Sequence, residues 1–407
     1  MPGTWDYRRY GTLPDPIHKS HLNSITGDYG CPKQFRYQMD ARVASPDHSD
    51  TDVAVSGKTA AGTAVHETIA RALAKLDDSR RVPRWQYSEA QVRAVFMQEF
   101  ERETRGREVL WYDKSGETIL ADRVAMVRGL LNDLHRHVAT VELVEPGFIV
   151  QCGDYWLSGH IDLVYRPSAA PDRLAISDWK TGSAKPIEIE LDHSWEAGVY
   201  SAALFGGRFL PREVVVVSAE ADGRHTASVR LGPNSFSSAT RVSRYVAERD
   251  ALEAALIELA SGRGEWLRPV TFEEFPKQVH YVALQDYVPY KRAGSRQVSR
   301  REDLQHYGYD APRSHKYVAG DTRGAAWLPV QITEHDVPRL AARLRNVVGM
   351  IRMGRFIDQV GERCRRCAWA DDCLHSGYAP QGSERQQLEL ALRKSHYDPT
   401  EDGLSDA

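Results

Sequence analysis

Apolar residues recur at helical spacing in the first third of the chain. The pattern predicts a helix from Ala60 onward, with His66 beside its apolar face. The apolar stripe of this helix consists of Val65, Ile69, Leu73 and Leu76. The same spacing predicts further helices over residues 24–38, 88–104, 117–140, 192–205, 235–260 and 333–355.

The hydrophobic period changes from helical to two after residue 147, which is typical of half-buried strands. Strands are predicted over residues 148–151, 155–165, 173–180, 213–219 and 225–231. The loop 166–172 joins two of them as in a β-meander. We expect the valine-rich strand at 213–219 to be buried. Helices and strands in this mixture indicate an α/β fold.

Residues 276–329 follow neither period. This segment is rich in tyrosine and basic side chains, and we interpret it as an inserted, loop-rich module. Basic residues also outnumber acidic ones over 291–316 and 339–366. Both basic segments suit contacts with nucleic-acid phosphates, although a solvated helix face is the ordinary explanation of the arginines.

Composition limits the classes of protein that remain. The chain has 407 residues, 42% of them hydrophobic, and a formal net charge of −3. Such a chain buries a large core and is not mainly disordered. Near neutrality excludes a uniformly basic surface. The sequence contains neither a long uninterrupted apolar run nor an apolar leader, so we expect a cytoplasmic protein without membrane segments.

Two carboxylates and a lysine form the most informative cluster. In a strand, residues two apart share a face, so Asp178 and Lys180 point to one side and Trp179 to the other. If the neighbouring strands pair, Asp162 lies near Asp178, and two close carboxylates repel unless a cation lies between them. Mg²⁺ or Mn²⁺ suits such oxygen ligands. The alternative is an ordinary charged solvent face of a hairpin.

The motifs around these carboxylates resemble those of the RecB-type PD-(D/E)XK nucleases. The matching segments, in family order, are Gly62-Thr-Ala-Val-His66, Gly159-His-Ile-Asp162, Asp178-Trp-Lys-Thr-Gly182 and Trp195-Glu-Ala-Gly-Val-Tyr200. The last resembles the family's Gln-x-x-x-Tyr helix, with Glu196 in place of the glutamine. The resemblance implies a restriction-endonuclease-like core, in which a central mixed sheet is flanked by helices, together with an N-terminal helical region.

The resemblance also assigns roles to individual residues. The metal ligands would be His66, Asp162, Asp178 and the backbone carbonyl of Trp179. Lys180 would assist the attacking water, and Tyr200 would orient DNA or the lysine. Glu196 departs from the family pattern: its carboxylate could reach the metal or a water, but it would repel phosphate.

Three cysteines within ten residues, Cys364, Cys367 and Cys373, suit zinc or an iron-sulfur cluster, and either needs a fourth ligand. Cys31 is the candidate, because its setting resembles the Ser-x6-Cys-Pro-x-x-Phe segment of RecB-type nucleases with a 4Fe-4S cluster, such as AddB-type helicase-nucleases and CRISPR adaptation nucleases. The competing interpretation is zinc held by the three cysteines and His375. Cys152, inside a strand, is expected to be an inert core thiol.

We therefore expect one nuclease core closed by an iron-sulfur clasp. Its parts would be an N-terminal segment with the first cluster cysteine (1–58), the RecB-type core (59–260), the basic insertion (261–330), a C-terminal helix with the cysteine cluster (331–380) and a polar tail (381–407).

The expected activity is that of a metal-dependent DNA exonuclease acting on ends or single strands in recombination, repair, or phage- or CRISPR-related processing. A catalytically silent DNA-end-binding or protein-interaction module on the same fold is the alternative. Because the chain has no Walker-type phosphate loop, a helicase, recombinase or CRISPR adaptation protein would be a separate partner.

Overall fold

A computed structural model describes the arrangement of most of the predicted elements. The described residues are 16–26, 31–32, 35–36, 54–111, 115–181, 195–219, 224–231, 234–238, 241, 244–260, 277–283, 326–330 and 336–353. The three clustered cysteines, His375, the polar tail and most of the segment 276–329 lie outside them. No helix in the described part of the chain is long and apolar enough to cross a membrane.

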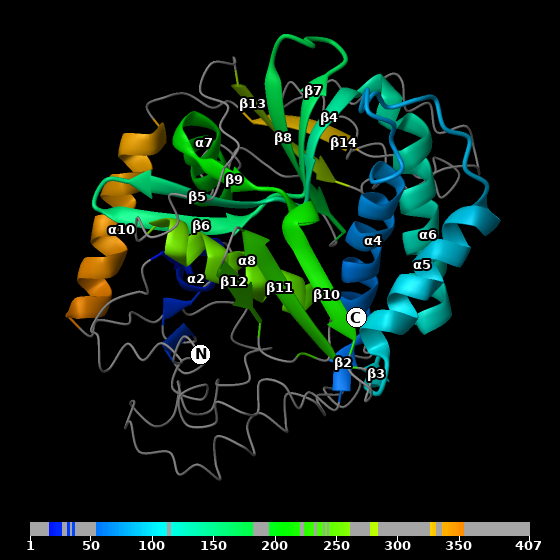
Figure 1. Ribbon diagram of the computed structural model, residues 1–407, viewed down its shortest axis with the longest axis horizontal. Coiled ribbons are helices and arrows are strands. Elements are labelled where there is room, and N and C mark those ends of the chain that lie inside the picture. The colour runs from blue at the N-terminus through cyan, green and yellow to red at the C-terminus, as the bar shows by residue number, and fades with distance from the viewer. Residues whose placement is uncertain are drawn as a thin grey trace, which may run out of the picture.

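A five-stranded mixed sheet lies at the centre of the structure (Figure 1). Its strands, in spatial order, are β14 (Ala326–Val330), β13 (Lys277–Ala283), β8 (Leu174–Lys180), β7 (Leu163–Pro167) and β4 (Val138–Val144). Strands β4, β7 and β8 are antiparallel neighbours, β13 runs parallel to β8, and β14 is antiparallel to β13. The α/β class and the mixed sheet agree with the sequence expectation.

Strands β7 and β8 are buried on both faces. Successive side chains of a strand point to opposite sides, and a separate core packs on each side. On one face, Tyr165 and Trp179 pack against helices. These helices are α4 (Gly57–Leu73), α5 (Glu89–Thr104) and α6 (Gly116–Asp133), to the right in Figure 1. On the other face, Val164 and Ile176 share a core with Tyr200. The sheet is therefore held between two separate cores.

The second core includes a four-stranded sheet and three helices. The strands are β1 (Ile17–His18), β6 (Tyr155–His160), β5 (Gly147–Cys152) and β9 (Arg208–Leu210), and the helices are α2 (Lys19–Thr26), α7 (Trp195–Gly206) and α10 (Asp336–Arg352). Cys152 is fully buried here, where burial raises the pKa of its thiol to about 11. It is a core thiol, as the sequence predicts.

Two smaller sheets complete the described fold. Strands β10 (Val215–Ala219), β11 (His225–Leu231) and β12 (Asn234–Ser237) form an antiparallel sheet, and α8 (Arg244–Ala260) packs on it. Strands β2 (Ala54–Ser56) and β3 (Glu108–Leu110) form a parallel pair. The expectation that the valine run at 213–219 is buried is wrong: β10 is an edge strand, and Val216 is 55% exposed.

Several predicted boundaries are also wrong. The helix predicted over 117–140 ends at Asp133, and after the 3-10 turn Leu134–Arg136 the chain enters β4. The helix predicted over 235–260 begins at Arg244, because β12 precedes it. The two ends of the supposed loop-rich module are β13 and β14, so they belong to the central sheet.

The strand predicted over 155–165 is two strands, interrupted at Ile161 and Asp162. Strand β6 belongs to the four-stranded sheet, whereas β7 belongs to the five-stranded sheet. Both segments alternate with period two, so periodicity alone does not locate the break. The interruption places Asp162 at the crossing between the two sheets.

Candidate metal centre

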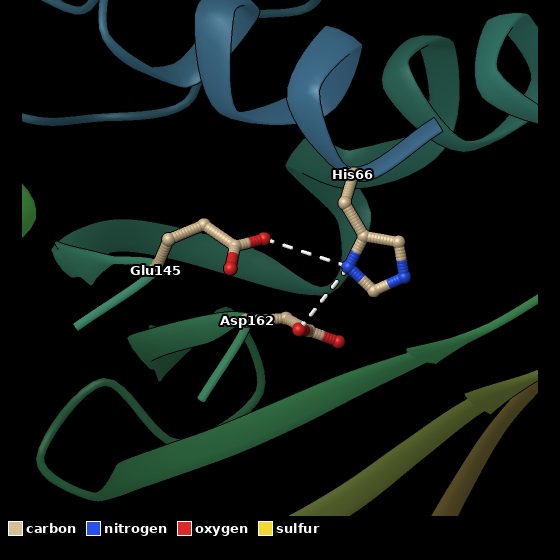
Figure 2. A group of neighbouring side chains, drawn as sticks. All are labelled: His66, Glu145 and Asp162. Atoms are coloured by element: carbon tan, nitrogen blue, oxygen red, sulfur yellow. Dashed lines mark ion pairs between the residues drawn. The ribbon is translucent and has the colours of Figure 1, made fainter. Parts of the chain in front are cut away.

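Three acidic or imidazole side chains converge where the two sheets meet (Figure 2). His66 comes from α4, Glu145 from the link between β4 and β5, and Asp162 from the link between β6 and β7. Nδ1 of His66 lies 3.2 Å from Oδ1 of Asp162 and 3.5 Å from Oε1 of Glu145. One ligand atom from each residue lies within 4.8 Å of the others.

Strand pairing holds the two carboxylates side by side. Val144 pairs with Leu163, so the residues just beyond this pair, Glu145 and Asp162, are neighbours at the sheet edge. The backbone N–H of Glu145 donates a hydrogen bond of 3.0 Å to the carbonyl oxygen of Asp162. A second bond of 3.1 Å runs from the N–H of Ile161 to the carbonyl of Pro146. These bonds join the link between β4 and β5 to the link between β6 and β7, where the chain passes from one sheet to the other.

Glu145 adopts a backbone conformation that is unusual for its residue type. Its φ is +47°, in the left-handed region, where a non-glycine residue costs about 1 kcal/mol or more. Such strain persists only where the surrounding structure imposes it, and it occurs often at functional sites. The conformation directs the chain from β4 into β5 and leaves the side chain beside His66.

Asp178 lies next to Asp162 across the β7–β8 pair. Leu163 pairs with Ser177, so the register continues from that pair to Asp162 and Asp178. Oδ2 of Asp162 accepts a short hydrogen bond from the backbone N–H of Trp179. The side chain of Trp179 packs in the helical core while that of Asp178 contacts α7, as the alternation along the strand predicts.

Tyr200 reaches Asp178 from α7. Its hydroxyl donates a hydrogen bond of 2.5 Å to Oδ1 of Asp178. The ammonium group of Lys19, at the start of α2, donates a short hydrogen bond to the same hydroxyl and lies 3.7 Å from Oδ1 of Asp178. Asp178 and Tyr200 were expected from the sequence; Lys19 was not.

Of Lys180 and Glu196 the structure describes the backbone only. Lys180 is the last residue of β8, two positions after Asp178. Glu196 lies in the first turn of α7, one turn before Tyr200. Cys31 is half-buried, and its carbonyl accepts a hydrogen bond of 2.8 Å from the N–H of the buried Phe35.

The charges of the centre are strongly coupled. Burial alone would lower the pKa of His66, but the negative charges of Asp162 and Glu145 outweigh it and raise that pKa well above its ordinary value. Burial and then the charge of Asp162 raise the pKa of Glu145. Burial is the largest influence on Asp162 and opposes its ionisation, but the charge and hydrogen bond of His66, the backbone N–H of Trp179 and the charge of Lys19 together lower the Asp162 pKa. A positive charge between the carboxylates would therefore stabilise their ionised forms.

This donor set fits a divalent cation. The ligand oxygens of Glu145 and Asp162 lie within 4.8 Å of each other. Two negative charges at that separation repel by about 3 to 4 kcal/mol at an effective dielectric constant of 20. Nδ1 of His66 and Oε1 of Glu145 are buried, and within the described residues neither makes a hydrogen bond of ordinary geometry. One imidazole nitrogen and two carboxylates are ligands that Mn²⁺ or Mg²⁺ accepts. Glu145 was missed because no sequence motif marks it.

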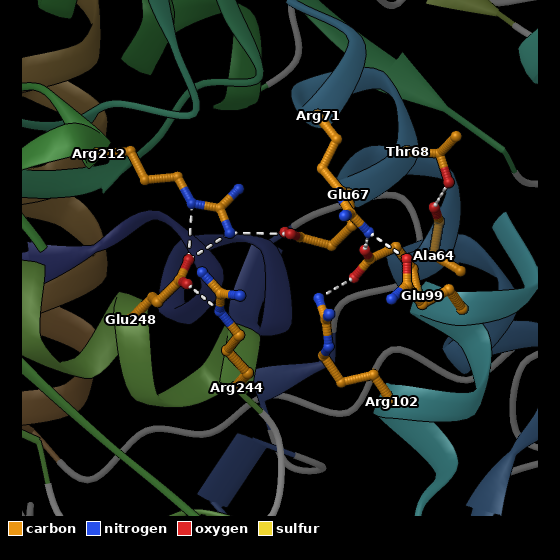
Figure 3. Close-up of polar contacts among 10 residues, drawn as sticks. Ala64, Glu67, Thr68, Arg71, Glu99, Arg102, Arg212, Arg244 and Glu248 are labelled. Carbon is orange, nitrogen blue, oxygen red and sulfur yellow. Dashed lines mark hydrogen bonds and ion pairs between the residues drawn. The ribbon is translucent and has the colours of Figure 1, made fainter. Parts of the chain in front are cut away.

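An ion-pair network fixes the helix that carries His66 (Figure 3). Glu67, the next residue on α4, accepts a hydrogen bond of 2.9 Å from Arg212. Arg212 also donates to Glu248 of α8 at 2.6 Å, and Arg244 donates to the same carboxylate at 2.7 Å. One turn beyond Glu67, Arg71 pairs with the buried Glu99 of α5. The network ties α4 to two neighbouring helices.

The family model of the PD-(D/E)XK nuclease superfamily matches residues 29–374. This span contains His66, Glu145, Asp162, Asp178 and Tyr200. Lys19 precedes it. None of the curated proteins matches the chain.

We expect Asp162→Asn and Glu145→Gln each to weaken Mn²⁺ binding at least about tenfold, because each removes a charged ligand from a closed donor set. Isothermal titration calorimetry on the metal-free protein measures the affinity. Glu101→Gln is the matched control, since Glu101 is exposed on α5. Unchanged affinity in both site variants would contradict the assignment.

Mn²⁺ affinity should also fall as the pH is lowered. Protonated His66 cannot bind a metal, and its pKa is raised, so protons compete with Mn²⁺ below that pKa. The apparent dissociation constant should rise by up to about tenfold per pH unit as the pH is lowered through this range. Calorimetric titrations at a series of pH values would show this dependence, and a flat profile would exclude His66 as a ligand.

Proposed function

The chain belongs to the PD-(D/E)XK nuclease superfamily, and on this basis we propose that it is a metal-dependent DNA exonuclease. Its substrates would be DNA ends or single strands. The observation that carries the proposal is the convergence of His66, Glu145 and Asp162 beside Asp178, within the segment matched by the family. The preference for an exonuclease rests on the resemblance to the RecB type.

This proposal assigns a task to the metal ligands, to Lys180 and to Tyr200. His66, Glu145, Asp162 and Asp178, with the backbone carbonyl of Trp179, hold Mg²⁺ or Mn²⁺. A divalent cation held there would supply Lewis-acid chemistry, polarising the phosphodiester and lowering the pKa of a water. Lys180 orients the attacking water and stabilises negative charge on the phosphate. Tyr200 holds Asp178 in place, and Glu196 lies one helical turn from Tyr200 on α7.

A basic helix supports contact with the DNA backbone. Arg339 and Arg345 are exposed on α10, which packs against α7. Arg343 of the same helix lies over the ring of Trp195, 4.1 Å from its centroid. Arginines on such a surface bind phosphates, and stacking on an aromatic ring pre-orders the guanidinium. Unwinding of duplex DNA would come from a separate helicase, and a recombinase or CRISPR adaptation protein is a further candidate partner.

The decisive assay uses DNA labelled at either the 5′ or the 3′ end, with Mn²⁺ or Mg²⁺. We expect progressive shortening by the wild type and a loss of at least about 10²-fold in Asp178→Ala and Lys180→Ala, because each removes charge from the reacting centre. Lys75→Ala, at an exposed position after α4, should retain full activity. Equal cleavage by all variants would refute the nuclease proposal.

The same assay distinguishes an active nuclease from the alternative, a catalytically silent module. Such a protein would retain DNA binding in a gel-shift experiment but would release no nucleotides with either metal. Internal cleavage of a circular single strand would reject the exonuclease assignment while preserving the nuclease assignment.

We further propose that Cys31, Cys364, Cys367 and Cys373 bind a 4Fe-4S cluster that joins the N-terminal segment to the C-terminal part of the chain. The hydrogen bond between Cys31 and the buried Phe35 supports this, because it ties the first ligand to the protein core. The less favoured alternative is zinc bound by the three clustered cysteines and His375.

Anaerobically purified protein should be brown, with a broad absorption near about 400 nm that is lost in Cys31→Ala, since thiolate-to-iron charge transfer requires an assembled cluster. Iron and zinc contents should be measured in parallel. Cys152→Ala is the control, because Cys152 is a buried core thiol. A colourless protein with one zinc per chain, retained in Cys31→Ala, would establish the zinc alternative.

A further inference from the structure

Lys19 brings a positive charge to the candidate metal centre from outside every recognised motif. It precedes the segment matched by the family and lies 159 positions before Asp178 (178 − 19) in the sequence. Its ammonium nevertheless contacts both Asp178 and the hydroxyl of Tyr200. It also lies over the ring of Tyr200, 4.5 Å from the centroid.

The backbone around Lys19 is fixed on both sides. Immediately before it, β1 pairs in parallel with β6, with Ile17 opposite Leu157 and His18 opposite Ser158. After it, α2 buries Leu22 and Ile25 completely in the core that also contains Tyr200. Strand pairing and helix packing therefore fix the backbone position from which the Lys19 side chain extends.

The side chain of Lys19 is only 12% exposed. Ordering and partly desolvating a lysine is unfavourable unless a partner compensates for the cost. The compensation is the carboxylate of Asp178, whose side chain is 6% exposed, together with the hydroxyl and ring of Tyr200. This contact joins α2, β8 and α7.

The contact also determines how Asp178 is oriented. Tyr200 and Lys19 both approach the same carboxylate oxygen, Oδ1. With one oxygen held from the side of α2 and α7, rotation of the carboxylate is restricted. The charge of Lys19 further offsets part of the mutual repulsion among Asp178, Asp162 and Glu145, which are all buried.

We propose that Lys19 is a positioning residue of the metal centre: it orients the Asp178 carboxylate through Tyr200 and provides a counter-charge for the buried carboxylates before a divalent cation binds. The inference rests on the proposed function in taking Asp178 as a metal ligand. Since Lys19 and the cation carry charge of the same sign, Lys19 opposes metal binding while it improves the geometry of the centre.

This dual role predicts opposite effects in one variant. Relative to the wild type, Lys19→Met should bind Mn²⁺ several-fold more tightly, because a repelling charge is removed. Its melting temperature should be lower without metal and should rise more on adding Mn²⁺. Its kcat for DNA cleavage should fall about tenfold, with KM within about twofold, because the orientation of Asp178 is lost.

Two further variants sharpen the test. Lys19→Arg keeps the charge and should restore the wild-type Mn²⁺ affinity and most of kcat. Lys75→Met removes an equal charge from an exposed position and should match the wild type in every measurement. Calorimetry and thermal unfolding use no nucleic acid, so they test Lys19 even if the wild type binds Mn²⁺ but cleaves no DNA, an outcome that refutes only the nuclease proposal.

Unchanged Mn²⁺ affinity and an unchanged Mn²⁺-induced rise in melting temperature in Lys19→Met would overturn the proposal. Weaker Mn²⁺ binding would also overturn it, because that is the effect of general structural damage. If Lys19→Met does not fold, Tyr200→Phe provides the test: it retains the ring but loses the hydroxyl, and it should lower kcat while Mn²⁺ affinity is preserved. Unchanged kcat in Tyr200→Phe would refute the positioning role.

Discussion

The structure buries three carboxylates in one small region, and the other features of the site follow from this burial. Glu145, Asp162 and Asp178 are each less than 10% exposed, and carboxylates so placed are stable only beside positive charge. In the described structure His66 pairs with Asp162 and Lys19 pairs with Asp178, and Arg212 adds positive charge near Glu145. A divalent cation would supply it more effectively, and this requirement links the local electrostatics to the proposed chemistry.

The fold brings these carboxylates together because the chain breaks between β4 and β5 and again between β6 and β7, at the same end of the five-stranded sheet. The chain leaves the five-stranded sheet after β4 and enters it again at β7, and the two crossings are hydrogen-bonded to each other. One crossing carries Glu145 in a left-handed conformation, and the other carries Asp162. Helix α4, tied to α5 and α8 by ion pairs, brings His66 over both (Figures 2 and 3).

The sequence predicts the part of this site that lies in local patterns. Helical spacing places His66 beside the apolar face of α4, and strand alternation separates Asp178 from Trp179. The break at Asp162 is not predictable from periodicity, because β6 and β7 keep the same alternation although they belong to different sheets. Glu145 depends on a positive φ, and Lys19 on pairing between segments distant in sequence, so no local pattern reveals either residue.

We infer that His66, Glu145 and Asp162 form a divalent-cation site. The most direct test is an anomalous difference map from crystals of the protein grown with Mn²⁺. We expect a peak within bonding distance of all three side chains, at ligand separations of about 2.0 to 2.6 Å. If crystals saturated with Mn²⁺ showed no peak there, or only a peak bound by other residues, the result would contradict this assignment.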